Sequence, residues 1–135
     1  MDKKLEHRVR RRAHDCCEYC HMPQAAYRFR FPIDHIIARQ HGGKTTFQNC
    51  AVACLRCNAH KGPNIAGVDP RTGEIVRLFH PRRDKWFEHF RWRGALLLGQ
   101  TPIARATIVV LSINHPRIVG VREALMAEGA FPFLK

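Results

Sequence analysis

Two cysteine pairs, Cys17-Glu-Tyr-Cys20 and Cys54-Leu-Arg-Cys57, decide the fold of this sequence. In each C-x-x-C pair a tight turn can present two thiolates to one tetrahedral Zn²⁺, and two such pairs complete a four-cysteine site. The insert between the pairs, residues 21–53, is longer than in an ordinary zinc knuckle. We therefore predict a structural zinc that staples a substantial segment, with the chemistry of the protein inside that segment.

The sequence contains six cysteines, so Cys16 and Cys50 lie outside the two pairs. We interpret them as a spare thiol and a small core residue, with Cys16 as an alternative to Cys17 in the zinc site. C-x-x-C pairs also occur in redox proteins, which would have accessible, reactive thiols in place of bound zinc.

Length and composition favour one compact domain that binds a polyanion. The chain has 135 residues, and 45% of them are hydrophobic, which is enough to build a core. The 23 Lys and Arg against 11 Asp and Glu give a formal net charge of +12, which points to nucleic acid ahead of an anionic membrane. No apolar stretch is long enough to cross a bilayer, and the basic start is not followed by a signal-peptide core. We expect a cytoplasmic protein with reduced thiols and no membrane partner.

We expect an α+β fold in which one small domain has three parts. Residues 1–15 form a basic helix or arm, because Leu5, Val9 and Ala13 recur at helical spacing among six Lys and Arg. Those basic residues either contact phosphate or form a solvated face. Residues 16–63 form the zinc-stapled core, and residues 64–135 a β-meander with two helices as an extension of the same domain.

Within the core, the pattern predicts strand, loop, strand and helix. Apolar side chains alternate with polar ones over residues 26–33, which predicts a half-buried strand that ends at Asp34. Gly42-Gly43 predicts a loop, and residues 47–54 return to apolar character. Residues 55–60 read as a short helix that Lys61-Gly62-Pro63 ends.

The extension begins with turn-forming residues and a strand at 74–79. Alternation over 85–93 predicts another strand, with Trp86, Phe90 and Trp92 on its packed face and Phe87, His89, Arg91 and Arg93 on its other face. A further strand is expected at 95–99. Thr101-Pro102 starts a helix over 102–113, and Asn114-His115-Pro116 starts a second helix that Gly129 ends.

Four polar residues of the core, Asp34, His35, Asn49 and Asn58, have the chemistry that phosphodiester hydrolysis requires. Such hydrolysis needs a base to activate water and a cation to offset charge at the phosphate. Asp34 and Asn58 are hard oxygen donors suited to Mg²⁺, and histidine can accept a proton near pH 7. The alternative is structural, with the aspartate and asparagines as loop or helix caps and His35 as a buried side chain.

These residues and their order resemble the HNH nucleases with a ββα-metal core, in the branch that carries two C-x-x-C pairs. The resemblance covers about residues 16–63, and the matching motifs are Cys17-x-x-Cys20, Asp34-His35-Ile36-Ile37, Gly42-Gly43 with Thr45, Asn49, and Cys54-x-x-Cys57-Asn58-x-x-Lys61-Gly62. It implies a metal-dependent endonuclease that leaves 5′-phosphate and 3′-hydroxyl ends.

The resemblance also implies roles for individual residues. His35 would be the general base, Asp34 and Asn58 would bind the catalytic metal, and Asn49 would orient the loop and the base. Where some members have an H-x-x-x-H pair, this chain has Asn58 and Gly62. The loss of both histidines favours Mg²⁺ or Mn²⁺ over a catalytic transition metal.

Double-stranded DNA is the expected partner, with no small-molecule cofactor. Arg39, Lys44 and Lys61 are candidates for phosphate contacts near the site, and Arg91 and Arg93 offer a second positive face. The rival from another class is a zinc-stapled DNA-binding module without catalysis. The apolar pattern marks no interface with a second copy.

Overall fold

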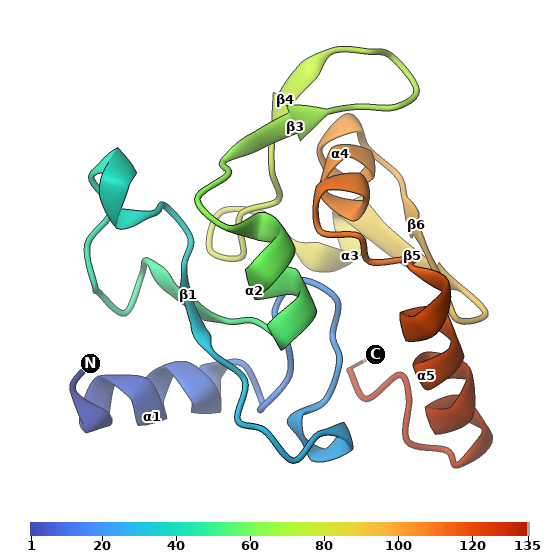
Figure 1. The fold of residues 1–135 in the computed structure, drawn as a ribbon, viewed down its shortest axis with the longest axis horizontal. Coiled ribbons are helices and arrows are strands. Elements are labelled where there is room, and N and C mark those ends of the chain that lie inside the picture. Colours follow the sequence, from blue (N-terminus) through green and yellow to red (C-terminus); the bar gives the residue numbers. More distant parts are fainter. Residues whose placement is uncertain (135) are drawn as a thin grey trace.

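The computed structural model describes residues 1–134 and shows a single α+β domain, in which short antiparallel strand pairs surround a central helix (Figure 1). The helices are α1 (Lys3–Arg12), α2 (Leu55–Lys61), α3 (Trp86–His89), α4 (Pro102–Val110) and α5 (Pro116–Ala127). The strands pair as β1 (Ile33–His35) with β2 (Cys50–Val52), β3 (Ala66–Val68) with β4 (Ile75–Arg77), and β5 (Phe90–Arg93) with β6 (Leu96–Gly99). The predicted fold class is confirmed, and the predicted meander takes the form of two separate hairpins.

The β1, β2 and α2 elements form the unit that positions the candidate site. In the β1–β2 ladder Asp34 lies opposite Ala51 and His35 opposite Cys50, and β2 is buried along its whole length. Cys54 begins α2, because its Sγ accepts a hydrogen bond from the backbone N–H of Cys57 at 3.4 Å. The predicted helix at 55–60 is thereby confirmed.

The strand predicted over 26–33 is wrong for most of its length. Residues 24–26 form a 3-10 turn, and β1 begins only at Ile33. The side chain of Gln24 donates to the carbonyl of Phe29 at 2.8 Å and accepts from the N–H of Phe31 at 2.6 Å. Because this carboxamide supplies hydrogen-bond partners for the backbone groups of Phe29 and Phe31, the segment needs no neighbouring strand.

The basic helix predicted at the N-terminus is confirmed as α1, with Val9 and Ala13 buried against the core. Two of its arginines bind backbone instead of facing solvent. Arg10 donates to the carbonyl of Phe31 at 2.8 Å, and Arg12 donates to the carbonyls of Phe47 and Cys50. These arginines therefore fasten α1 to two separate parts of the core insert.

The strand predicted over 85–93 is wrong for residues 86–89, which form the helical turn α3 before β5 begins. This turn directs the Trp86 indole N–H to the carbonyl of Tyr19, 2.8 Å away, and stacks the indole on the buried ring of His21 at 3.7 Å. A buried indole N–H needs an acceptor, and the cysteine turn supplies one.

Helices α4 and α5 begin as predicted. The Thr101 side chain accepts from the N–H of Ala104, and the His115 side chain accepts from the N–H of Arg117. The α4 helix ends at Val110, short of residue 113, because Ser112 adopts a left-handed conformation with φ +52°. No helix in residues 1–134 combines the length and the apolar character that crossing a membrane requires.

The buried guanidinium of Arg122 holds parts of the C-terminal extension, residues 64–135, together. Arg122 of α5 has no solvent exposure and donates to the carbonyls of Ala95 and Ile113 at 2.8 and 3.0 Å. It also lies 5.2 Å from the ring centre of Trp92. Arg122 thus connects the β5–β6 hairpin with the α4–α5 turn, beside the cysteine cluster.

Candidate functional site

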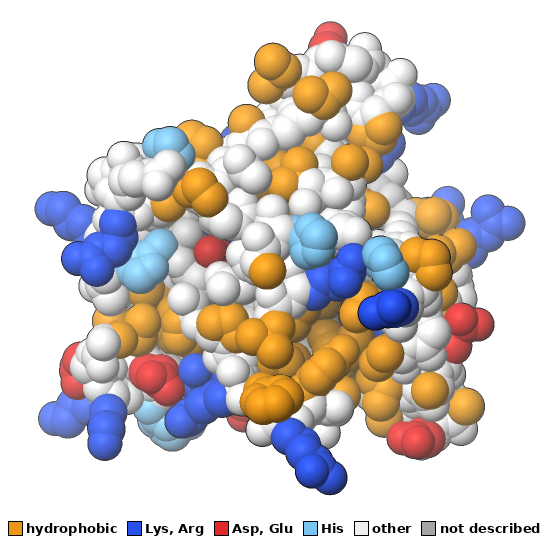
Figure 2. Space-filling model, viewed as in Figure 1, with side chains coloured by type: hydrophobic (Ala, Val, Ile, Leu, Met, Phe, Trp, Pro, Cys, Tyr) orange, Lys and Arg blue, Asp and Glu red, His pale blue; other side chains and the backbone are white. Residues whose placement is uncertain are grey.

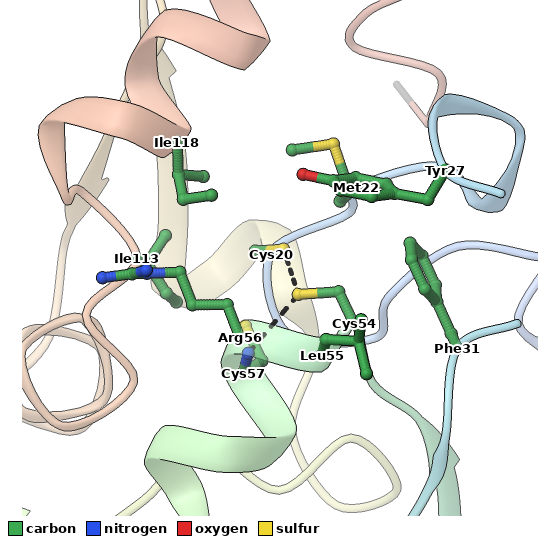
Figure 3. Close-up of a pocket in the computed structure, with 10 residues that line it drawn as sticks. All are labelled: Cys20, Met22, Tyr27, Phe31, Cys54, Leu55, Arg56, Cys57, Ile113 and Ile118. Carbon is green, nitrogen blue, oxygen red and sulfur yellow. Dashed lines mark hydrogen bonds between the residues drawn. The ribbon is translucent and has the colours of Figure 1, made fainter. Parts of the chain in front are cut away.

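Four buried cysteines from the two predicted pairs meet in one cluster. The sulfur atoms of Cys17, Cys20, Cys54 and Cys57 all lie within 4.8 Å of one another. Figure 3 shows the Cys20 and Cys54 sulfurs facing each other, 3.7 Å apart. Tetrahedral zinc with Zn–S bonds of about 2.3 Å requires sulfur atoms about 3.8 Å apart. The donor set and its spacing therefore fit a structural zinc ion.

The turns around the cluster supply N–H donors to the sulfur atoms. The N–H of Cys20 donates to the Cys17 sulfur at 3.5 Å, as that of Cys57 does to Cys54. Hydrogen bonds from neighbouring thiols lower the pKa of Cys54, whereas burial raises the pKa of Cys17. A bound cation would favour the thiolate form of all four residues.

Cys16 lies outside the cluster. It is buried, and desolvation raises the pKa of its thiol to about 11. The choice between Cys16 and Cys17 as ligand, which spacing left open, is therefore decided for Cys17. Cys50 is fully buried in β2, as expected of a small core residue.

In the middle of β1, Asp34 is held by two partners that are themselves buried. The Tyr19 hydroxyl donates to Oδ2 at 2.7 Å, and Lys61 Nζ lies 3.1 Å from Oδ2 and 3.3 Å from Oδ1. Burial raises the pKa of Asp34 although Lys61 and Tyr19 both act to lower it. The carboxylate is thereby fixed in orientation at the edge of the ladder.

The phosphate contact predicted for Lys61 is wrong. Its side chain is 2% exposed, and Nζ also donates to the carbonyls of His35 and Ile36 at 3.2 and 3.0 Å. The contacts of Nζ all lie inside the protein, because this ammonium satisfies carbonyls that the end of β1 leaves without a strand partner. Lys61 is a brace between α2 and β1.

The next residue, His35, is half-buried, with Nε2 2.8 Å from the hydroxyl oxygen of Thr45. Thr45 belongs to the loop that Asn49 holds in place. The Asn49 side chain accepts from the N–H of Ile37 and donates to the carbonyls of Ile37 and Lys44, each at 2.9 Å. Asn49 thus braces the loop that carries the partner of His35.

Gly43 permits this close packing. A Cβ atom at this position would lie 1.7 Å from the carbonyl oxygen of Ile37 and 2.9 Å from Asn49 Nδ2. Only glycine fits at position 43, and Gly42 has φ +87°, a left-handed conformation that favours glycine.

Asp34, His35 and Asn58 line one open cleft of about 370 Å³, together with Arg39. Two stretches distant in sequence therefore contribute to one surface: β1 with the loop that follows it, and α2 with the residues after it. Lys44 is exposed next to Thr45, but Arg91 and Arg93 are exposed on β5, on the opposite side of the molecule from β1 (Figure 1). The structure brings together the predicted ligand and base residues and separates the β5 arginines from them.

Sequence reasoning assigned no role to Thr45 or Tyr19. Thr45 stood inside the quoted motif, and Tyr19 lies between the two cysteines of the first pair. Only the folded chain shows that one hydroxyl contacts His35 and the other contacts Asp34.

Residues 17–64 match the family model described as HNH endonuclease. Neither a curated protein nor a solved structure matches the chain. The matched range contains both cysteine pairs and every residue of the cleft described above. HNH domains combine bound metal with nuclease or nucleic-acid-binding activity. Residues 17–64 of this chain are similar to an HNH endonuclease domain, and four buried cysteines within this range are placed to bind one metal ion.

Proposed function

We propose that this protein is a metal-dependent DNA endonuclease, with His35 as the general base and Asp34 and Asn58 as ligands of a catalytic Mg²⁺ or Mn²⁺. The observation that carries the proposal is that all three residues line one cleft. The net charge of +12 supports a nucleic-acid substrate, and an open cleft suits a bulky duplex better than a small molecule.

The donor set in the cleft fits a hard divalent cation. Asp34 supplies a carboxylate whose orientation Tyr19 fixes, and Asn58 supplies an amide oxygen from α2. Mg²⁺ needs only one or two protein ligands, because water and substrate phosphate complete its octahedron. When bound, the cation would offset negative charge on the scissile phosphate and the leaving oxygen.

In the proposed mechanism, the contact with Thr45 gives the two ring nitrogens of His35 different roles. If Nε2–H donates to the Thr45 hydroxyl, 2.8 Å away, Nδ1 carries no proton and can accept one from water. Asn49 keeps the Thr45 loop in place and so maintains this tautomer. Arg39 at the edge of the same cleft would contact a phosphate next to the one that reacts.

One observation favours the second candidate function, a DNA-binding domain without catalysis. The Lys61 ammonium lies 3.1 Å from Asp34 Oδ2, and a positive charge there opposes a second cation on the same carboxylate. In that case the cleft would bind phosphate but hydrolyse nothing.

Cleavage of supercoiled plasmid distinguishes the two functions. We expect nicked or linear DNA with Mg²⁺ or Mn²⁺ but not with EDTA, and no product from the His35→Ala variant. His41→Ala is the matched control, because His41 is exposed in the segment that follows β1 but does not line the cleft. Zinc content is measured in every sample. DNA binding without cleavage by the zinc-loaded wild type would establish the binding module instead.

A further inference from the structure

A group of four basic side chains lies beside α2, outside the cleft. It consists of Arg56, His60, His115 and Arg117, and we call it the α2–α5 basic cluster. Arg56, Arg117 and His60 are close enough to His115 that their charges help burial to lower the pKa of His115. Figure 2 shows Lys or Arg and His side chains gathered beside α2, with no acidic side chain between them in that view.

The α2 helix separates this cluster from the cleft. Positions 56 and 60 are one turn apart and share a side of the helix, whereas position 58 lies on the opposite side. Accordingly Asn58 lines the cleft, and Arg56 extends past Ile113 toward the α4–α5 turn (Figure 3). The core and the C-terminal extension each contribute half of the cluster.

Two of the four side chains are held in place by hydrogen bonds. Arg56 donates to the backbone carbonyl and the hydroxyl of Ser112, both at 3.1 Å. His115 Nδ1 accepts from the N–H of Arg117 at 3.1 Å at the start of α5. The two bonds to Ser112 orient the Arg56 guanidinium before any ligand arrives, which lowers the entropy cost of binding.

The cluster lacks internal compensation for its charge. In the described part of the chain, no Asp or Glu forms a salt bridge with any of its four members. The positive charges of Arg56 and Arg117 have no acidic partner there, and a polyanion offsets the repulsion between them. The favoured polyanion is one that already occupies the neighbouring cleft. Once it is bound there, its effective concentration at the cluster is high.

We infer that the α2–α5 basic cluster binds backbone phosphates of the same DNA duplex whose scissile phosphate enters the cleft, an inference that rests on the proposed function. An α-helix with its side chains is only about 10–12 Å across. Phosphates of one duplex can therefore contact both sides of α2. The C-terminal extension acts as a clamp that sets the position of the duplex.

The test compares two charge reversals of equal size, Arg117→Glu in the cluster and Arg71→Glu in the exposed turn between β3 and β4. Affinity for a fluorescently labelled duplex is measured by anisotropy over a range of salt concentrations, without Mg²⁺ or Mn²⁺, so that no cleavage occurs. An acidic residue in the first turn favours a helix, so Arg117→Glu should leave α5 folded, which circular dichroism checks.

We expect Arg117→Glu to weaken binding about tenfold more than Arg71→Glu. It should also reduce the slope of log K against log salt by about 1, as the loss of one phosphate contact does. Equal losses in the two variants would mean that only net charge matters and would overturn the inference. If the wild type cleaves plasmid and the two reversals are equivalent, the inference fails alone. A wild type that neither binds nor cleaves DNA overturns the proposed function as well.

Discussion

Lys61 Nζ lies 3.1 Å from Oδ2 of Asp34, and both side chains are almost wholly buried. The ammonium also donates to two backbone carbonyls at the end of β1. A residue that looks from the sequence like a DNA contact is thus part of the framework that holds the candidate ligand. This pair connects the last turn of α2 with the ladder and so sets the shape of the cleft.

Replacing Lys61 should therefore destabilise the protein. We expect Lys61→Met to lower the free energy of unfolding by about 3 kcal/mol, because the variant leaves the buried Asp34 carboxylate without its counter-charge. Urea denaturation measures the change. The control is Lys44→Met, at an exposed position in the same domain, which should change stability by no more than about 0.5 kcal/mol. Equal midpoints for the two variants would contradict the bracing role.

The Thr45 hydroxyl should matter for turnover more than for binding. In Thr45→Val the imidazole of His35 loses the partner of Nε2, so the ring is less well oriented and its tautomer is less well defined. Loss of such a supporting hydrogen bond costs about 10–100-fold in activity. We expect kcat for plasmid nicking to fall by that factor, with unchanged DNA affinity and a shifted pH profile. Thr45→Ser, which keeps the hydroxyl, should restore activity; failure to do so would show that the methyl group matters instead.

The cysteine cluster makes a specific prediction about metal content. Cys17→Ser should lose the bound zinc and much of its folded structure, because a structural site needs all four ligands. Cys16→Ser should keep about one zinc per chain, since Cys16 lies outside the cluster. Native mass spectrometry with and without a chelator measures the zinc content of both variants. Loss of zinc from the Cys16 variant would reverse the ligand assignment.

His115 should make stability depend on pH. Its folded-state pKa is lowered by burial and by Arg56, Arg117 and His60, so the neutral form is favoured in the folded protein. The stability that it contributes is complete above the unfolded pKa, about 6.5, and is lost as pH falls below that value. Protonation also removes the acceptor for the Arg117 N–H at the start of α5.

The variant that isolates this effect is His115→Asp, which keeps a helix-capping acceptor but does not titrate near neutrality. We expect its melting temperature to exceed that of the wild type by a margin that grows as pH falls from about 7.5 to about 5.5. A margin that stays constant over this range would mean that His115 does not couple to folding.

The elements that could be predicted from sequence are those whose signals are local. Thr101-Pro102 and His115-Pro116 start helices because a cap and a proline act within one turn. The cysteine spacing anticipated the cluster because each C-x-x-C turn positions its own two sulfur atoms. The motif likewise named the three polar residues that line the cleft, since its spacing reflects the ββα unit.

The two strand predictions that were wrong, over 26–33 and 85–93, failed because the local structure depends on side-chain hydrogen bonds that alternation does not reveal. The alternation at 26–33 did not produce a long strand, because the Gln24 side chain satisfied the backbone where a neighbouring strand was expected. Residues 86–89 turned into a helix because Trp86 found its acceptor at Tyr19. Neither interaction leaves a periodic signal in sequence.

By itself, the sequence determined the fold class, the metal-binding cysteines and the polar residues of the cleft, because each follows from residue type and short-range spacing. Only the tertiary structure decided that Lys61 is buried, that Cys17 and not Cys16 joins the cluster, and that α2 separates the cleft from four basic side chains. The physical reason is burial. A charged side chain that folding removes from water stabilises the protein interior, whereas one that stays in water is free to bind a ligand.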